Sequence, residues 1–410
     1  MAAAAPETPP AERSTFRLRA GADPSYPPLP AELRAPGALE SRVRAWAAVA
    51  GSAAAERLAR LFPATPPELG EEWAKISSKV DAATEAAAPI LQPCPLSRAL
   101  FPLQDVKVFG FRKLLERLHW IAQEVDLSRD WADLERASEG DRRLLETILG
   151  FFAVGDELVL EGLDRRVKEA FPSKEAGYYF CEQQTQECVH SEAYSLQVDA
   201  LIAPERRAAV YAAVLERPEV GRVADWVRWW VYGDHSVADL TLVLAFIEGV
   251  LFSGFFAALH HFRTRNLFPG VTGYNEFICR DEGVHSLFWC FLLTDRLAVR
   301  PSRETLESVA RETVGLSAAL FEAASPEADG GSLSAAQISQ YVRYTADSVA
   351  ASAGYGPVFG DANPFPFMES LALNAVAKTN FFEAPTTSYQ SLSRPEALAF
   401  RALAAPLAEP

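Results

Sequence analysis

Two Glu-x-x-His motifs are the part of this sequence best suited to chemistry. One is Glu187-Cys-Val-His190 and the other is Glu282-Gly-Val-His285. Residues three apart share a face of a helix, so each motif presents a carboxylate beside an imidazole. Such a pair can bind one metal ion. A single motif is a weak indication, because it usually belongs to a solvated helix face.

Two further acids lie inside apolar stretches. Asp156 follows Gly-Phe-Phe-Ala-Val-Gly, and Glu248 is the only charged residue in Thr241–Leu259. Buried carboxylates are unfavourable unless they are paired or bind metal. The chain order is acid, Glu-x-x-His, acid, Glu-x-x-His, which is typical of a two-metal carboxylate site in a ferritin-like bundle. Such ligands suit paired iron or manganese, whereas structural zinc would need cysteines or a tetrahedral set.

Long helices are needed to position these residues. From about residue 100, apolar residues recur with helical spacing, which predicts an all-α, ferritin-like helical bundle with long core helices and disordered termini. The candidate helices cover roughly 106–123, 141–169, 174–201, 204–216, 219–232, 236–266, 274–298, 302–324 and 334–353. Thr241–Leu259 is nearly long enough to span a membrane, but Glu248 in its middle favours a buried core helix.

Composition divides the protein into four parts. Fourteen of the 28 prolines precede residue 96, which separates an N-terminal region from the helical region. We predict a disordered Ala/Pro-rich arm over 1–37 and an N-terminal helical extension of unknown role over 38–99. A di-metal domain over 100–383 and a flexible C-terminal tail over 384–410 follow.

Charge and cysteine content exclude several classes of protein. The 410 residues carry a net charge of −15, and no basic face for nucleic acid is visible. The five cysteines are odd in number and lack Cys-x-x-Cys spacing, which favours a reducing compartment over a disulfide framework. No secretory signal is visible, and the early acids Glu7 and Glu12 disfavour a transit peptide. We therefore predict a cytoplasmic protein that binds neither nucleic acid nor membrane.

Over roughly residues 100–390, the sequence resembles the radical-generating small subunit of class I ribonucleotide reductase. The motifs that carry the resemblance are Trp120-Ile-Ala-Gln-Glu-Val-Asp-Leu-Ser-Arg-Asp130, Glu187-Cys-Val-His-Ser-Glu-Ala-Tyr-Ser195, Ile247-Glu-Gly-Val-Leu-Phe-Ser-Gly254, Arg280-Asp-Glu-Gly-Val-His285 and Lys378-Thr-Asn-Phe-Phe-Glu383. Several separate motifs in the same order make the resemblance specific. It implies a ribonucleoside-diphosphate reductase small subunit, an oxidoreductase that is active with a large subunit.

The resemblance also implies roles for individual residues. One metal would be held by Asp156, Glu187 and His190, and the other by Glu248, Glu282 and His285. The two metals would be iron, with manganese as the alternative. Tyr194 matches the family's radical tyrosine, and its spacing from Glu187 and His190 independently places it on the same helical face.

The chemistry implied by the resemblance begins with O2. Two reduced metal ions would react with O2 and oxidise Tyr194 to a neutral radical. Phe252, Phe256 and Ile278 share faces with the ligands and would form an apolar shell around the radical.

The radical would act on a separate large subunit, which reduces ribonucleotides to deoxyribonucleotides. The implied relay runs from His190 through Asp281 to Trp120 and out through Tyr389 in the tail. Asp281 could instead simply pair with an arginine such as Arg280. Family members are usually homodimers.

The sequence departs from the family pattern at two places. Cys188 lies between two ligands, where the family commonly has a polar amide, so metal preference or radical stability could shift. The C-terminus lacks the acidic, hydrophobic ending with which many relatives dock the large subunit, although Phe400, Leu403 and Leu407 could anchor it.

Other functions use a similar metal site. A ferritin-like iron oxidase or store would need neither Tyr194 nor Trp120. Oxygenases, desaturases and ligand-binding oxidases related to the family are disfavoured by Asp156 and by the tyrosine after His190. An inactive paralogue is disfavoured by the intact ligand set, and a variant with a metal-based oxidant usually lacks this tyrosine.

Overall fold

The computed structural model describes residues 80–93, 100–162, 166–325 and 333–369, and over 154–162 it describes the backbone alone. These residues belong to one compact unit, Ala47–Pro410. The predicted arm (1–37), most of the predicted extension and the predicted tail (384–410) lie outside the described residues.

Every regular element of the described residues is helical. In sequence order the elements are α4 (Ala82–Ala86), η2 (Pro89–Leu91), α5 (Val106–Leu118), η3 (Ala122–Glu124), α6 (Asp130–Arg136), α7 (Glu139–Gly162), α8 (Lys168–Ala170), α9 (Lys174–Leu201), α10 (Pro204–Leu215), α11 (Pro218–Tyr232), α12 (Val237–Phe246), η5 (Ile247–Leu251), α13 (Ser253–Thr264), α14 (Pro269–Phe291), η6 (Leu292–Arg296), α15 (Arg303–Ala324), α16 (Ala335–Ser352) and η7 (Pro366–Met368).

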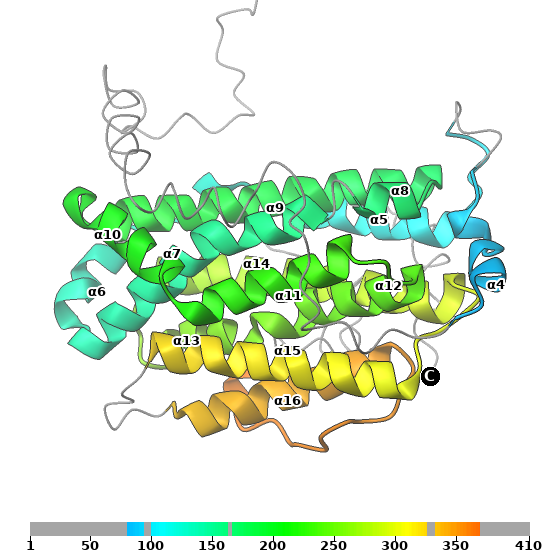
Figure 1. Ribbon diagram of the computed structural model, residues 1–410. Coiled ribbons are helices and arrows are strands. Elements are labelled where there is room, and N and C mark those ends of the chain that lie inside the picture. Colours follow the sequence, from blue (N-terminus) through cyan, green and yellow to red (C-terminus); the bar gives the residue numbers. More distant parts are fainter. Residues whose placement is uncertain (1–79, 94–99, 163–165, 326–332, 370–410) are drawn as a thin grey trace, which may run out of the picture. The chain divides into compact units, whose positions relative to one another are not determined.

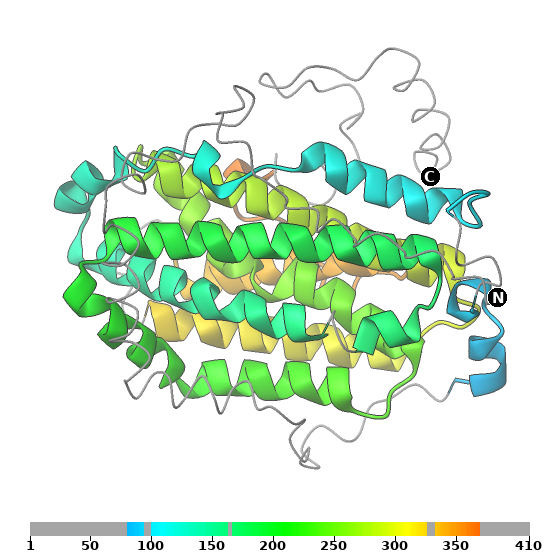
Figure 2. The ribbon, with the colours of Figure 1, turned by 90° about the horizontal axis from the view of Figure 1, so that it is seen from above.

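The long helices lie side by side. Helix α9 packs against α5 and α7, α14 packs against α12 and α13, and α15 packs against α16. Figure 1 and Figure 2 show the axes of these helices nearly aligned, with α7 and α9 running in opposite directions. The predicted all-α bundle with long core helices is therefore confirmed.

Local signals explain why most predicted helix boundaries agree with the observed ones. The hydroxyl groups of Ser173, Ser236 and Ser334 each accept a hydrogen bond from the backbone N–H three residues later. These bonds satisfy N–H groups that a helix start leaves unpaired. Proline opens α10, α11 and α14, where its missing N–H is not needed. Helix α9 accordingly begins and ends where the predicted 174–201 helix does.

The predicted helix over 236–266 is interrupted. One π-helical turn, η5, separates α12 from α13 and contains Glu248. Gly249 packs very closely here, because a Cβ atom at this position would lie 2.5 Å from Ser286 Oγ and 2.7 Å from Val349 Cγ2. The turn is thus fitted against α14 and α16, and such long-range contacts leave no trace in the helical periodicity.

The most apolar segment of the described residues is Val237–Thr264. It is long and apolar enough to cross a membrane, but 94% of its most apolar window is buried inside the fold. Its neighbours are α14, α15 and α16. A helix enclosed by other helices must be apolar on all sides. The prediction of a buried core helix over Thr241–Leu259 is confirmed.

The burial of this helix can be tested with one substitution at two positions. We expect Val243→Ala, in the centre of α12, to lower the free energy of unfolding by about 2 kcal/mol, since Val243 is fully buried. Val106→Ala should change it by less than about 0.5 kcal/mol, because Val106 is 41% exposed. Urea unfolding would measure both, and equal losses would contradict the packing described.

Candidate metal centre

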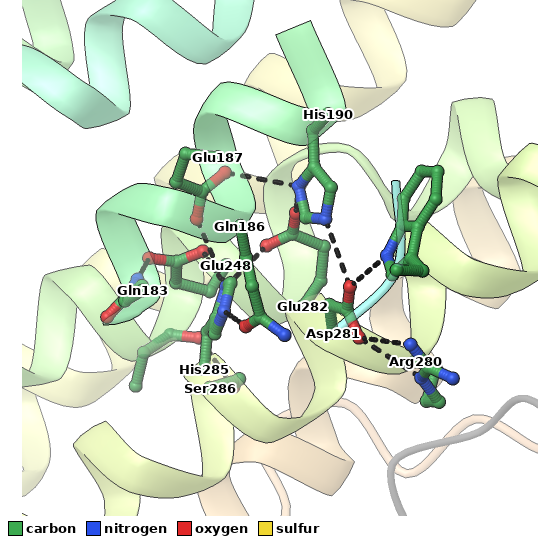
Figure 3. Close-up of polar contacts among 12 residues, drawn as sticks. Gln183, Gln186, Glu187, His190, Glu248, Arg280, Asp281, Glu282, His285 and Ser286 are labelled. Carbon is green, nitrogen blue, oxygen red and sulfur yellow. Dashed lines mark hydrogen bonds and ion pairs between the residues drawn. The ribbon is translucent and has the colours of Figure 1, made fainter. Parts of the chain in front are cut away.

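Three elements bring the two Glu-x-x-His motifs and Glu248 together. Helix α9 carries Glu187 and His190, α14 carries Glu282 and His285, and η5 carries Glu248. Ligand atoms of Glu187, Glu248, Glu282 and His285 all lie within 4.8 Å of one another. Figure 3 shows these side chains pointing toward a common centre. His190 contacts Glu187 and Glu282, so five of the six ligands proposed from the sequence lie in one cluster.

The two imidazoles face the acids through the same ring atom. His285 Nδ1 lies 3.1 Å from Glu187 Oε1, 3.3 Å from Glu282 Oε2 and 3.6 Å from Glu248 Oε2. His190 Nδ1 lies 3.2 Å from Glu187 Oε2 and 3.0 Å from Glu282 Oε1. One ring N–H cannot serve several carboxylates at once. Convergence of this kind fits the carboxylate and imidazole donors that bind iron or manganese.

Burial makes this concentration of negative charge unfavourable. Glu187 and Glu248 are 2% and 4% exposed. Burial raises the pKa of the Glu248 carboxyl well above its usual value, and the Glu187 and Glu282 carboxylates raise it further, although the hydrogen bond to His285 lowers it. Burial opposes charge on both imidazoles, but the surrounding acids hold the pKa of His190 and His285 above the usual value. A bound divalent cation would compensate these acids directly.

The outward ring nitrogens have their own partners. His190 Nε2 lies 3.2 Å from Asp281 Oδ2, and His285 Nε2 lies 2.9 Å from Gln186 Oε1. An acceptor at Nε2 favours the tautomer that leaves Nδ1 available as a metal ligand, which is the usual arrangement around metal-bound histidine. The acceptor at Nε2 of each histidine is the strongest evidence that these side chains suit a metal ion.

Two glutamines of α9 were missed by the sequence analysis. Gln183 Nε2 donates a hydrogen bond of 2.7 Å to Glu248 Oε1, and Gln186 accepts from His285. Both glutamines are buried. Their positions relative to Glu187 continue a polar stripe along one face of a core helix, and that stripe is the signal that could have revealed them.

Asp281 joins the cluster to Trp120. The indole Nε1 of Trp120 donates to Asp281 Oδ2 at 2.7 Å, and Arg280 donates to Asp281 Oδ1 from Nε and Nη2 at 3.0 and 2.9 Å. The alternative pairing of Asp281 with Arg280 therefore exists together with the contact to His190. Burial acts to raise the pKa of Asp281, but Arg280, His190 and Trp120 outweigh it and hold the pKa below its usual value. Asp281 is thus kept as a carboxylate in the core.

Tyr194 lies in an aromatic environment. It is 1% exposed, and its ring stacks on Phe152 with centroids 4.6 Å apart. Phe152 in turn contacts Phe252 and stacks on Phe256. Ile278 is also buried. The predicted shell residues Phe252, Phe256 and Ile278 thus all lie in the core, and the structure adds Phe152.

Two predicted site residues cannot be placed. Position 156 lies within α7, but the side chain of Asp156 is outside what the structure describes, and so is the whole of Tyr389.

A cavity of about 40 Å³ borders Glu248 and Glu282 and has walls from α13, α14 and α16. It has room for a molecule of about the size of water.

Replacing Glu248 tests the electrostatic account. We expect Glu248→Gln to raise the unfolding free energy of the metal-free protein by about 1 kcal/mol, because it removes one of several crowded buried acids. It should also remove most of the stabilisation gained on adding Fe(II) or Mn(II). Thermal unfolding with and without metal would measure both effects.

The matched control is Glu175→Gln, which makes the same substitution at another buried glutamate. Glu175 is buried but lies outside the cluster, where its Oε1 accepts the Gln104 N–H. This variant should keep the full metal-dependent stabilisation. A metal-free Glu248→Gln protein less stable than the parent would contradict the account.

Comparison with known proteins agrees with this arrangement. Residues 97–364 match the family model described as ribonucleotide reductase, small chain. The protein is 37% identical over 306 residues to the ribonucleoside-diphosphate reductase small chain of African swine fever virus (strain Badajoz 1971 Vero-adapted), covering 74% of this sequence and 92% of the viral one. It is 36% identical over 307 residues to a ribonucleoside-diphosphate reductase small chain of Arabidopsis thaliana, covering 74% and 91%.

Solved structures share the fold. The Rnr4 homodimer of ribonucleotide reductase from Saccharomyces cerevisiae has a TM-score of 0.65 at 23% identity, covering 70% of this protein and 91% of the yeast one. Dimanganese(II)-NrdF from Streptococcus sanguinis has a TM-score of 0.60 at 18% identity, covering 67% and 98%. The family model covers more than half of the sequence and the two small chains are 37% and 36% identical to it over 74% of its length, so the protein belongs to the ribonucleotide reductase small chain family.

Proposed function

We propose that this protein holds a stable tyrosyl radical at Tyr194, generated with O2 at a two-metal centre, and passes its oxidising equivalent to a separate large subunit. The reaction served is the reduction of ribonucleoside diphosphates to deoxyribonucleotides. Membership of the small chain family supports the subunit role and the oxidoreductase class.

The observation that carries the proposal is a continuous polar line through the core. It runs from His190, in the acid cluster, through Asp281 to the indole of Trp120, with separations of 3.2 and 2.7 Å. All three side chains are nearly or wholly buried. The contact between His190 and Asp281 is usual for a metal-bound histidine, but an iron store has no use for the further bond from Asp281 to the Trp120 indole, whereas a path for an electron and a proton does.

The residues of the centre would hold two metal ions. Glu187, His190 and Asp156 would bind the first, and Glu248, Glu282 and His285 the second. The proposed metals are two irons, with manganese as the alternative. When bound, such metals supply the one-electron chemistry with O2 that protein side chains lack.

Tyr194 would lose one electron and its phenolic proton to become a neutral radical. It lies one turn beyond His190 on α9, so the same helix positions ligand and radical site. Tyr194 is 1% exposed and its ring stacks on Phe152, on which Phe252 and Phe256 pack in turn. Water and soluble reductants are thereby kept from the radical.

Competing functions are less well supported by the site. An inactive paralogue would be expected to have lost ligands, yet the five described ligand side chains converge. An oxygenase or storage protein would not require Trp120 to face Asp281. A metal-based oxidant would leave the aromatic enclosure of Tyr194 without a purpose.

We further propose a homodimer that works with a large subunit in the cytoplasm. The Saccharomyces cerevisiae relative is described as a homodimer. Free thiols at Cys181, Cys188, Cys279 and Cys290 suit a reducing compartment. Tyr389 is the proposed last step of the relay on this subunit.

Electron paramagnetic resonance tests the radical directly. After the metal-free protein is loaded with Fe(II), or separately with Mn(II), and exposed to O2, we expect a tyrosyl signal that Tyr194→Phe abolishes. Tyr179→Phe is the matched control, because Tyr179 is equally buried on the same helix, and it should keep the signal. Metal oxidation without any radical would instead favour an oxidase or a store.

The relay makes a separate prediction. Trp120→Phe removes the indole N–H that binds Asp281 while leaving the acid cluster intact. The tyrosyl signal should therefore form as in the parent protein. Ribonucleotide reduction with the large subunit should fall at least about 100-fold, because the loss of one transfer step raises the barrier by several kcal/mol. Normal turnover would rule out Trp120 as a relay residue.

A further inference from the structure

The segment that carries Trp120 has little regular structure of its own. Residues 119–129 connect α5 to α6, and the short η3 is their only helical turn. The predicted helix over 106–123 ends at Leu118, and α6 was not predicted. The position of this segment must therefore come from its contacts with other elements.

The segment is tied to α14 along its length. The Tyr274 hydroxyl donates to the Ala122 carbonyl oxygen. The Trp120 ring also packs against Tyr274 and Phe277, with centroids 6.0 and 5.2 Å away. Together with the bond from Trp120 to Asp281, these contacts make the segment run antiparallel to α14.

Asp130, the first residue of α6, ties the far end of this segment. Its carboxylate is fully buried, and it accepts the Gly270 N–H at Oδ2 and the Val271 N–H at Oδ1, both at 2.9 Å. Asp133 adds a bond of 2.8 Å from the Phe268 N–H. These N–H groups belong to the start of α14, where a helix leaves donors unpaired.

Gly270 permits the contact to be this close. A Cβ atom at this position would lie 2.7 Å from the Asp126 carbonyl oxygen and 2.7 Å from Asp130 Oδ2. The backbone of the 119–130 segment and the start of α14 therefore touch directly. Any side chain at position 270 would push the two apart.

We propose that Asp130 is a positioning residue of the relay: by fixing the 119–130 segment to the start of α14, it holds the Trp120 indole within hydrogen-bond distance of Asp281. This inference rests on the proposed relay function of Trp120. Gly270 and Asp281 lie eleven residues apart on one rigid helix, about 16 Å. Tying the segment at both ends of this span sets its register, and a hydrogen bond of 2.7 Å tolerates less than about 1 Å of drift.

Asp130→Asn tests the proposal with little change in shape. Asn keeps one oxygen acceptor but turns an amide toward the second N–H, so one tie is lost. We expect the tyrosyl signal of Tyr194 to form normally, since the acid cluster is untouched. Turnover with the large subunit should fall at least tenfold. The ¹⁹F resonance of Trp120 in 5-fluorotryptophan-labelled protein, assigned with Trp120→Phe, should shift or broaden.

Two further variants make the result specific. Asp126→Asn is the matched control, because exposed Asp126 lies on the same segment and its side chain binds Ser128 rather than α14; it should leave the Trp120 resonance and turnover unchanged. Gly270→Ala places a Cβ atom 2.7 Å from Asp130 Oδ2, so it disturbs the same tie without touching Trp120, and it should perturb the same resonance. It keeps the test informative if Asp130→Asn fails to fold.

The outcomes separate this inference from the proposed function. An unshifted Trp120 resonance in folded Asp130→Asn and Gly270→Ala proteins would overturn the positioning role, whatever their activity. Normal turnover of Trp120→Phe would instead overturn the relay. A shifted resonance with reduced turnover and an intact tyrosyl signal supports both.

Discussion

The fold is organised around an electrostatic problem, which is a group of carboxylates held in an apolar core. Glu187, Glu248 and Glu282 crowd two imidazoles, and the first two acids are buried while the side chain of Glu282 is only 13% exposed. In a low-dielectric interior such acids repel one another strongly, and only cations or hydrogen-bond donors can offset them. Packing of the surrounding helices keeps these carboxylates together despite their repulsion and the cost of burying them.

Hydrogen-bonding side chains surround the acid cluster, and aromatic side chains lie beyond them. Gln183, Gln186 and Asp281 hold the outward atoms of the cluster, and Arg280 in turn binds Asp281. Beyond them the core is aromatic, as around Tyr194. The polar line from His190 to Trp120 therefore crosses a largely apolar interior. That asymmetry is what a protein needs if an oxidising equivalent is to leave by one path and remain stable against all others.

The position of Trp120 depends on contacts with residues distant in sequence, which the local sequence pattern did not predict. Its motif was apparent in the sequence, and so was its resemblance to a relay residue. The segment around it was predicted to be helical, and this was wrong beyond Leu118, because bonds to α14 replace the intrahelical ones. Gly270 and Asp130 meet across 140 residues of sequence. The hydrophobic periodicity of either segment cannot predict this contact.

Local patterns were enough to predict the all-α class, most helix boundaries and the two Glu-x-x-His motifs that converge with Glu248. Apolar periodicity and Glu-x-x-His spacing each depend on residues close together in sequence, so they can be recognised before the fold is known. Which atoms face one another depended on tertiary packing: the π turn that bears Glu248, the Nδ1 orientation of both imidazoles, and the glutamines that bind the outer atoms. These features arise from contacts between helices distant in sequence, and such contacts are fixed only when the whole bundle forms.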